Sequence, residues 1–389
     1  MTTHVFIVDS TTFNLHLQHQ FAGTGAKDYR VDFNRSWKTA LHHSVENMLV
    51  GMIADASRVR RGDHIIFYLQ QDFARGIREG KFFGVFRATS DGSFLDDNDG
   101  KQYLRGELGK SLTFRVQIEP HTVYAEGVTE WEALDDIRAL ASPNQMLWSL
   151  IYRKLKGNRG NTMITGYEAD RLNHLLRNKN GRLELDCGEM ALTFDAISQR
   201  ISPEKASRRV YQGRREPIDI VPRLVEKWKK GNAFEAHLQA YITQFVGRGV
   251  NESLDRSLLG SASEIEWIGN EVSCGVGMQR IDIMLSVVER GQRTVIPIEL
   301  KAVEADERNV LQLQRYVDWI EQYYVPNRPS DVRPILLAMR TENKGTTSYK
   351  AVRESIRRFN DTNAARCHAL RVVELSVSDS GLSFEQVAY

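Results

Sequence analysis

The chain has 389 residues, a length that favours two domains over one. Its hydrophobic content of 41% and charged content of 26% are ordinary for a soluble globular protein, so each half can bury a core. Lys and Arg number 52 against 50 Asp and Glu, and the net charge of +2 excludes a uniformly basic nucleic-acid-binding surface. Any nucleic-acid-binding surface must therefore be confined to a local basic patch.

Cysteine spacing and hydropathy indicate the cellular compartment in which the protein is expected. Cys187, Cys274 and Cys367 lack Cys-x-x-Cys spacing, which favours free thiols over a disulfide framework or a zinc site. No apolar run approaches the roughly 20 residues that span a bilayer. Met1 leads into a strand-like segment without a basic, cleavable signal. We expect a cytoplasmic protein without membrane association.

The first 125 residues predict mainly short strands, because apolar or alternating runs are punctuated by Gly-Asp, Asp-Gly and Asn-Asp-Gly turns. The strand-like runs cover residues 5–8, 64–69, 82–86 and 112–118. One helix is expected at about 40–58, where His43, Asn47, Val50 and Ala54 recur at helical spacing.

Two motifs in this half resemble a known fold. Residues 60–68, RRGDHIIFY, and residues 80–88, GKFFGVFRA, resemble the core of PUA-like barrels, with the EVE and YTH branches nearest. The resemblance spans residues 1–185. It implies a β-barrel with helices that takes an extruded, often modified base into an aromatic pocket, where stacking contributes about 1–3 kcal/mol per base.

Aromatic residues are the candidates for such a pocket. The candidate walls are Trp37, Tyr68, Phe83 and Trp131, with Trp148 behind them. A place in the core is the alternative for each ring. Trp37 is favoured because it lies in the polar, basic stretch at residues 34–38. For Arg60 and Arg61 the alternatives are a phosphate contact and a solvated turn.

The middle of the chain predicts two helices and a basic hinge. Helices are expected at about 144–156 and 166–178, the second with Thr165 as N-cap and Glu168 at its third position. Prolines and clustered arginines and lysines mark residues 196–229 as a hinge. Its last basic cluster, Lys227, Lys229 and Lys230, is a candidate contact for a phosphate backbone.

From about residue 230 helices and strands alternate, which predicts an α/β domain with a mixed sheet. Two strand-like runs, residues 280–285 and 295–301, carry charges among apolar residues, although burying a charge costs several kcal/mol unless it is paired or bound to metal. A tight hairpin with Arg290-Gly291 at its tip places Asp282 opposite Glu299, with β-carbons roughly 4.5–5.5 Å apart. Lys301 shares the face of Glu299.

Two carboxylates this close repel each other unless a divalent cation lies between them. A Glu-x-Lys triplet alone is expected about once or twice by chance in a chain of this length. The aspartate in register and the following helix-like segment with Gln312 and Tyr316 make the pattern specific. Hard oxygen ligands suit Mg²⁺ or Mn²⁺, so the residues predict a magnesium or manganese site with a lysine beside it.

These residues resemble a nuclease family. Asp282 with Glu299-x-Lys301 resembles the PD-(D/E)xK signature, and the continuation to Gln312-x-x-x-Tyr316 is similar to DNA endonucleases of the NucS/EndoMS type. The resemblance covers about residues 230–325. It implies a restriction-endonuclease-like mixed sheet flanked by helices.

The resemblance also implies roles for individual residues. A glutamate on the first helix of the nuclease domain completes the metal shell in that family, and Glu235 takes this place here. Lys301 orients or deprotonates the attacking water or stabilises the transition state, and Gln312 positions Lys301 or a phosphate. Tyr316 packs its helix on the sheet, and Arg280 is a phosphate or packing contact. The expected metal ligands are Asp282, Glu299 and Glu235.

Together the patterns predict a two-domain protein of the α/β and α+β classes. Residues 1–195 form a PUA/EVE-like recognition domain, residues 196–229 the basic hinge and residues 230–389 the nuclease domain. The predicted function is metal-dependent DNA cleavage directed by base or modification recognition, as in restriction or defence. The alternatives are a NucS-like nuclease for mismatched or branched DNA and a non-catalytic binder of modified DNA or RNA. Double-strand cleavage needs two active centres, so a homodimer is expected.

Overall fold

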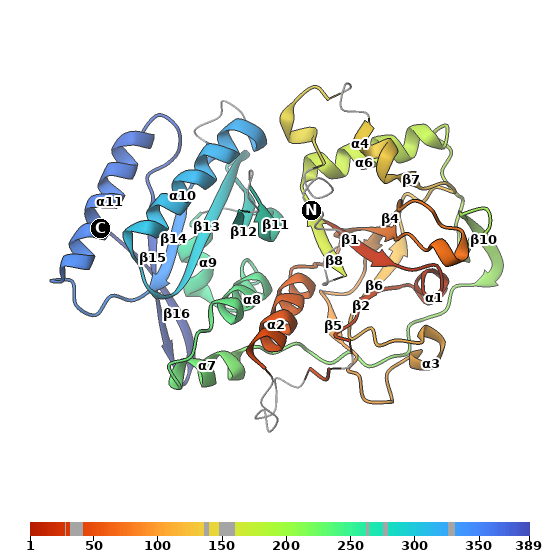
Figure 1. Ribbon diagram of the computed structural model, residues 1–389, viewed down its shortest axis with the longest axis horizontal. Helices are drawn as coiled ribbons and strands as arrows, with labels where there is room; N and C mark the ends of the chain where they lie inside the picture. The colour runs from red at the N-terminus through yellow and green to blue at the C-terminus, as the bar shows by residue number, and fades with distance from the viewer. Residues whose placement is uncertain are drawn as a thin grey trace. The chain divides into compact units, whose positions relative to one another are not determined.

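The computed structural model describes residues 1–27, 29–31, 42–135, 140–147, 160–261, 264–274, 279–325 and 331–389. Within these ranges the residues up to Ile218 form one compact unit and Asp219–Tyr389 form a second. Both units combine strands and helices, as expected for a two-domain mixed fold (Figure 1). The division falls inside residues 196–229, the predicted hinge.

The described part of the first unit contains one sheet of eight strands, ordered β2-β6-β4-β3-β1-β8, with β5 paired to β6 and β7 to β4. The strands are β1 (Thr3–Val8), β2 (Phe21–Thr24), β3 (His64–Leu69), β4 (Lys81–Ala88), β5 (Phe94–Leu95), β6 (Phe114–Pro120), β7 (Val128–Thr129) and β8 (Asn161–Ile164). A separate pair joins β9 (Met190–Asp195) to β10 (Arg200–Ser207). The order is open at β2 and β8, so these pairs do not establish the predicted barrel.

The α-helices in the described part of this unit are α1 (Phe13–His19), α2 (His43–Ser57), α3 (Arg105–Leu108), α4 (Glu130–Asp135) and α6 (Gly166–Lys179). The predictions at 40–58 and 166–178 correspond to α2 and α6. The Thr165 side chain accepts the Glu168 N–H and Glu168 accepts the Thr165 N–H, which is the predicted capping box. The helix expected at 144–156 lies largely outside the described residues.

The segment predicted as a hinge has regular structure. It contains β10 in the first unit and α7 (Val221–Lys229) in the second. Pro203 pairs with Leu192 in a sheet of only two strands, where a missing N–H costs little. Pro222 lies in the first turn of α7, where no N–H is needed. The prolines that suggested a linker therefore occupy positions that a strand and a helix tolerate.

The second unit contains a mixed sheet of six described strands in sequence order. They are β11 (Glu264–Ser273), β12 (Arg280–Glu289), β13 (Gln292–Glu304), β14 (Ile335–Met339), β15 (Arg371–Ser378) and β16 (Gly381–Val387). β13, β14 and β15 are parallel, and the remaining neighbours are antiparallel. The predicted mixed sheet is thus present.

Helices cover this sheet. They are α7, α8 (Glu235–Phe245), α9 (Glu252–Leu259), α10 (Glu307–Trp319), which continues as the π-helix η5 (Ile320–Tyr324), and α11 (Thr347–Asn363). α8 contacts β11, β12 and β13, whereas α10 contacts β13 and β14 and packs beside α11 (Figure 1). Both helices that carry further predicted site residues therefore contact β13, the strand of Glu299 and Lys301.

None of the helices in the described ranges combines the length and the apolar character needed to span a bilayer. The cysteines Cys187, Cys274 and Cys367 are free thiols, as their spacing predicts.

Candidate active site

The hairpin of β12 and β13 sets the geometry of the site. Glu289 pairs with Gln292 across a two-residue turn, whose residues Arg290 and Gly291 have φ of 52° and 81°. Positive φ at both positions is typical of the type I′ turns that match strand twist. From there the register runs without a shift to Ile283 opposite Ile298. Pro297 pairs with Met284 inside this register, so the proline does not displace it.

The pairing ends one residue before the predicted carboxylates face each other. Continued, the register would place Asp282 opposite Glu299 and Ile281 opposite Leu300. Instead, Asp282 Oδ2 accepts the backbone N–H of Leu300 at 2.8 Å. An aspartate side chain thus replaces the strand partner of Leu300, and this brings the carboxylate next to β13.

Asp282 is held from a second direction by α8. Gln239 Nε2 donates to the backbone carbonyl of Asp282 at 2.8 Å. Burial, and after it the nearby Glu299 carboxylate, raise the pKa of Asp282 to about 8. The protein therefore disfavours negative charge at this position unless a cation compensates it.

Glu299 is fully buried in the interior strand β13. Its Oε1 lies 2.8 Å from Lys301 Nζ in an ion pair, and its Oε2 accepts the Tyr316 hydroxyl at 2.7 Å. Burial raises the pKa of Glu299, although Lys301 and the Tyr316 hydroxyl favour its ionised form. Oε2 therefore has a hydroxyl donor, whereas Oε1 is held by an ion pair alone and accepts no hydrogen bond among the described residues.

Lys301 lies among oxygen atoms. Besides Glu299, its amine contacts the carbonyl oxygen of Leu300 at 2.7 Å and Glu235 Oε1 at 3.5 Å. Burial opposes the charged form, but attraction to Glu299 and then to Glu235 and Asp282 raises the pKa of the amine. Lys301 therefore stays an ammonium ion.

Helix α10 supplies the predicted Gln-x-x-x-Tyr pair. Asp306 accepts the N–H groups of Arg308 and Asn309 and so caps the helix beside the end of β13. Gln312 and Tyr316, four residues apart, share a helix face, and Gln312 Nε2 donates to the Tyr316 hydroxyl at 2.7 Å. Gln312 thus contacts Tyr316 in this structure, and its expected role in positioning Lys301 or a phosphate stays a prediction. That hydroxyl is also 2.7 Å from the Arg280 carbonyl.

The residues fit a hard cation as a two-carboxylate site. With both carboxyls ionised, Asp282 and Glu299 carry two negative charges against one positive charge on Lys301. Such oxygen donors suit Mg²⁺ or Mn²⁺. The predicted third ligand, Glu235, begins α8 with its side chain 46% exposed, and it contacts Lys301. No group of three His, Cys, Asp or Glu side chains in the described ranges is placed to hold a metal ion.

Arg280 is paired within the protein. Its guanidinium lies 2.7 Å from Glu271 Oε2. Glu271 has φ of 48°, which is rare for a glutamate, at the position of β11 opposite Asp282. The predicted phosphate contact is therefore engaged by an acid in this structure.

The basic cluster after the expected hinge is likewise engaged. Lys227 is buried, because it lies on the inner side of α7, and this corrects its predicted role at the surface. Lys229 pairs with Asp379, and Lys230 lies 2.5 Å from Glu226. The two exposed lysines remain accessible to a backbone phosphate only in competition with these acids.

Two of the predicted aromatic walls, Phe83 and Tyr68, lie on different faces of the sheet. Tyr68 on β3 pairs with Phe82 on β4, and Phe83 follows Phe82, so its side chain points to the opposite face and is buried in a different apolar cluster. Both are core residues. Among the candidates that the structure describes, Trp131 on α4 is the exposed one, at 56%. Trp37 and Trp148 lie outside the described residues.

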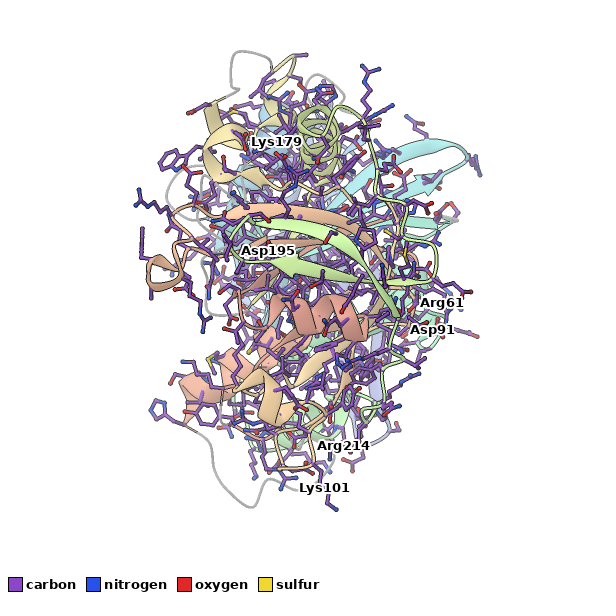
Figure 2. The ribbon with its side chains drawn as sticks, turned by 90° about the vertical axis from the view of Figure 1, so that its right-hand side faces the viewer. Arg61, Asp91, Lys101, Lys179, Asp195 and Arg214 are labelled. Atoms are coloured by element: carbon purple, nitrogen blue, oxygen red, sulfur yellow. The ribbon has the colours of Figure 1, made fainter. Side chains whose placement is uncertain are left out.

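The neighbouring basic turn forms a surface ion pair. Arg61 Nε lies 2.6 Å from Asp91 Oδ1, and both side chains are exposed (Figure 2). The solvated-turn alternative for Arg61 agrees with this pairing.

Gln239 is the functional neighbour that the sequence pattern did not single out. It follows Glu235 by one helical turn, so the two side chains share a face of α8. That spacing is the signal that could have found it, once Glu235 was placed at the site. The participation of the Leu300 backbone carried no sequence signal.

Comparisons with known proteins add little. No family model matches the chain, and no curated protein matches it significantly. Among solved structures, it is similar to a hypothetical protein from Leishmania major, with 10% identity and a TM-score of 0.29 over 46% of this chain and 96% of that one. It is also similar to human THYN1 protein, solved in complex with 5-methylcytosine containing DNA, with 10% identity and a TM-score of 0.26 over 45% and 97%. Likenesses this weak carry no argument about this chain.

Proposed function

We propose that this protein is a metal-dependent DNA endonuclease with its active site in the second unit. One observation carries the proposal. Asp282 accepts the Leu300 N–H, and Lys301 donates to the Leu300 carbonyl and pairs with Glu299, so the three charged side chains converge where β12 and β13 separate. A fully buried glutamate beside a partly buried aspartate and lysine is an expensive combination for a fold to maintain for stability alone. They are a suitable combination for phosphodiester hydrolysis.

The position of each residue determines its role in the proposed reaction. Asp282 and Glu299 would hold Mg²⁺ or Mn²⁺, and Glu235 offers a further oxygen from the exposed side. When bound, such an ion lowers the pKa of its water and offsets charge on the phosphate. The Lys301 ammonium would donate to the attacking water or to a non-bridging phosphate oxygen. Tyr316 would fix the orientation of Glu299 through its hydroxyl.

DNA as the substrate follows from the resemblance to the NucS/EndoMS type. We further propose that the first unit directs cleavage by recognising a base or its modification, as in restriction or defence. Its solvent-accessible Trp131 supports this part, since an exposed indole offers a stacking surface at no cost to the core.

The experiment that tests the function is digestion of a DNA panel by the full chain with Mg²⁺, Mn²⁺ or EDTA. The panel contains unmodified, base-modified, mismatched and branched duplexes of one sequence. Metal-dependent cleavage by the wild type and none by Asp282→Asn is the expected result. A preference for modified duplexes supports restriction, and one for mismatched or branched duplexes supports repair.

Two outcomes would count against the proposal. Cleavage by Asp282→Asn at the wild-type rate removes the active site from this position. Specific binding of modified DNA or RNA without cleavage under any metal would favour a non-catalytic binder. Sedimentation of the chain on a duplex, alone and with metal, tests the expected homodimer.

A further inference from the structure

The Lys301 amine occupies an unusual position for a lysine. Its Nζ is surrounded by oxygens of three different groups, the Glu299 carboxylate at 2.8 Å, the Leu300 carbonyl at 2.7 Å and the Glu235 carboxylate at 3.5 Å. The Leu300 carbonyl accepts a hydrogen bond from the ammonium, whereas the two carboxylates are ion-pair contacts, and Glu299 Oε1 has no hydrogen-bond partner among the described residues. Carboxylate and carbonyl oxygens are also the ligands that a hard divalent cation prefers.

We propose that the Lys301 ammonium and the divalent cation are alternative occupants of one oxygen-lined position, so that cation binding displaces the amine. The inference rests on the proposed function. It adds that Lys301 competes with the cation for the proposed site. Lys301 holds the carboxylates in place while no cation is bound. Once displaced, the same amine is released toward the open side of the site, where a phosphate would arrive.

The end of the strand ladder creates this position. In the hairpin, every second pair exchanges two backbone hydrogen bonds, and the pattern from the Glu289–Gln292 closure makes Ile281 and Leu300 the next such pair. That pair is not formed. Asp282 takes the Leu300 N–H and Lys301 takes the Leu300 carbonyl. Two side chains thus replace both halves of one missing backbone pair.

Electrostatic repulsion prevents the Lys301 ammonium and the divalent cation from occupying this position at the same time. An ammonium and a divalent cation cannot both contact Glu299 Oε1 and the Leu300 carbonyl, because like charges at contact distance repel strongly in a partly buried site. The lysine can leave without opening the core, since its side chain is 20% exposed and its stem is flexible. Displacement therefore requires a rotamer change and no unfolding.

The test is Mn²⁺ binding by the full chain without DNA, measured by isothermal titration calorimetry. We expect Lys301→Met to bind Mn²⁺ roughly ten-fold or more tightly than the wild type, ten-fold being about 1.4 kcal/mol. Lys301→Gln, which keeps a hydrogen-bond donor without the charge, should also bind more tightly. It serves as the second variant if Lys301→Met does not fold. Lys179→Met is the matched control, because Lys179 has a similar exposure and pairs with Glu132 at 2.6 Å (Figure 2).

Thermal unfolding gives an independent readout. Without metal, Lys301→Met should unfold at a lower temperature than the wild type, because Glu299 loses its counter-ion, and Mn²⁺ should stabilise the variant more than the wild type. Adding Asp282→Asn to Lys301→Met should remove the additional thermal stabilisation that Mn²⁺ gives to the Lys301→Met variant.

Each contrary result has a separate meaning. Unchanged or weaker Mn²⁺ binding by both lysine variants, with the wild type still binding, overturns the competition and leaves the metal site standing. Tight binding that survives Asp282→Asn places the ion elsewhere and overturns the competition. Absence of Mn²⁺ binding in every folded variant overturns both the competition and the proposed function.

Discussion

Asp282 accepts the backbone N–H of Leu300 at 2.8 Å, and through this bond a side chain on β12 takes over a place in the ladder of β13. The bond occupies one carboxylate oxygen and leaves the other available. It also ties the orientation of the carboxylate to the backbone on which Glu299 and Lys301 lie. The geometry of the site is therefore fixed by main-chain structure as well as by packing.

Asp282→Asn should abolish cleavage and stabilise the fold. The amide oxygen still accepts the Leu300 N–H, while folding at pH 7 no longer has to protonate a carboxylate whose pKa is raised to about 8 by burial. We expect an increase of about 1 kcal/mol or more in the free energy of unfolding, measured by urea denaturation in EDTA at pH 7. Asp361→Asn, at an exposed position, is the control. A destabilised Asp282→Asn would mean that the acid is structurally required.

Tyr316→Phe should impair both stability and cleavage. It removes the hydroxyl that links Gln312, Glu299 and the Arg280 carbonyl, and it leaves a buried carboxylate oxygen without its donor. A loss of about 1–3 kcal/mol is expected in urea denaturation. Cleavage should slow by roughly ten-fold. Gln312→Ala should have a smaller effect on both, since Gln312 reaches the carboxylate only through Tyr316, and equal effects would refute this order.

Gln239→Met should weaken cleavage although Gln239 contacts no predicted ligand side chain. Methionine has a similar volume but no donor, so the Asp282 carbonyl loses its 2.8 Å partner and α8 loses a link to β12. We expect a stability loss of about 1–2 kcal/mol and a reduced Mn²⁺ affinity. Unchanged Mn²⁺ affinity in calorimetry, alongside reduced stability, would limit Gln239 to a structural role.

Trp131→Ala should reduce discrimination among modified and unmodified duplexes without affecting the fold. The indole is 56% exposed, so the free energy of unfolding should change by less than about 0.5 kcal/mol. Tyr68→Ala is the contrasting variant, because this ring is buried and its removal should cost about 3–5 kcal/mol. Competition binding with matched duplexes measures the effect, and equal loss on all duplexes would remove Trp131 from recognition.

Stability should fall in mild acid partly because of His16. Burial lowers the pKa of this histidine to about 3, and its Nδ1 lies 2.9 Å from the Phe21 carbonyl. Between pH 3 and 6.5 the unfolded chain binds a proton that the folded chain excludes, so the contribution of His16 is present above pH 6.5 and is lost as the pH falls.

One such proton corresponds to a slope of about 1.4 kcal/mol per pH unit. His16→Asn, whose amide can replace the bond to Phe21, should reduce the slope of unfolding free energy between pH 4 and 6. The exposed His174→Asn is the control, and identical slopes in all three proteins would contradict the assignment.

The sequence was most informative where charged residues stood in strands that were otherwise apolar and expected to be buried. Charges at Asp282 and Glu299 interrupted apolar strands, and the turn at Arg290-Gly291 determined which residues face each other, so the register could be predicted. The capping box at Thr165 was equally local and was also confirmed. Patterns that depend on neighbours in sequence were sufficient for these features.

Features that depend on distant contacts could not be predicted. The separation of β12 and β13 before Asp282 depends on hydrogen bonds to Leu300 and from Gln239, which no periodicity encodes. Prolines at Pro203 and Pro222 suggested a linker, because composition cannot reveal that each occupies a tolerated position. Helix α9 and strand β16 carried no pattern strong enough to predict them.

The two-residue turn at Arg290-Gly291 has a consequence for how this chain can change over evolution. It lies roughly 27 Å along the strand from Asp282, at about 3.4 Å per residue. A single residue inserted between the turn and either acid would send that acid to the opposite face of the sheet. Insertions in this hairpin are therefore tolerable only when both strands lengthen by the same number of residues. The position of the two acids at one end of the hairpin depends on the number of residues that separate them from the turn at the other end.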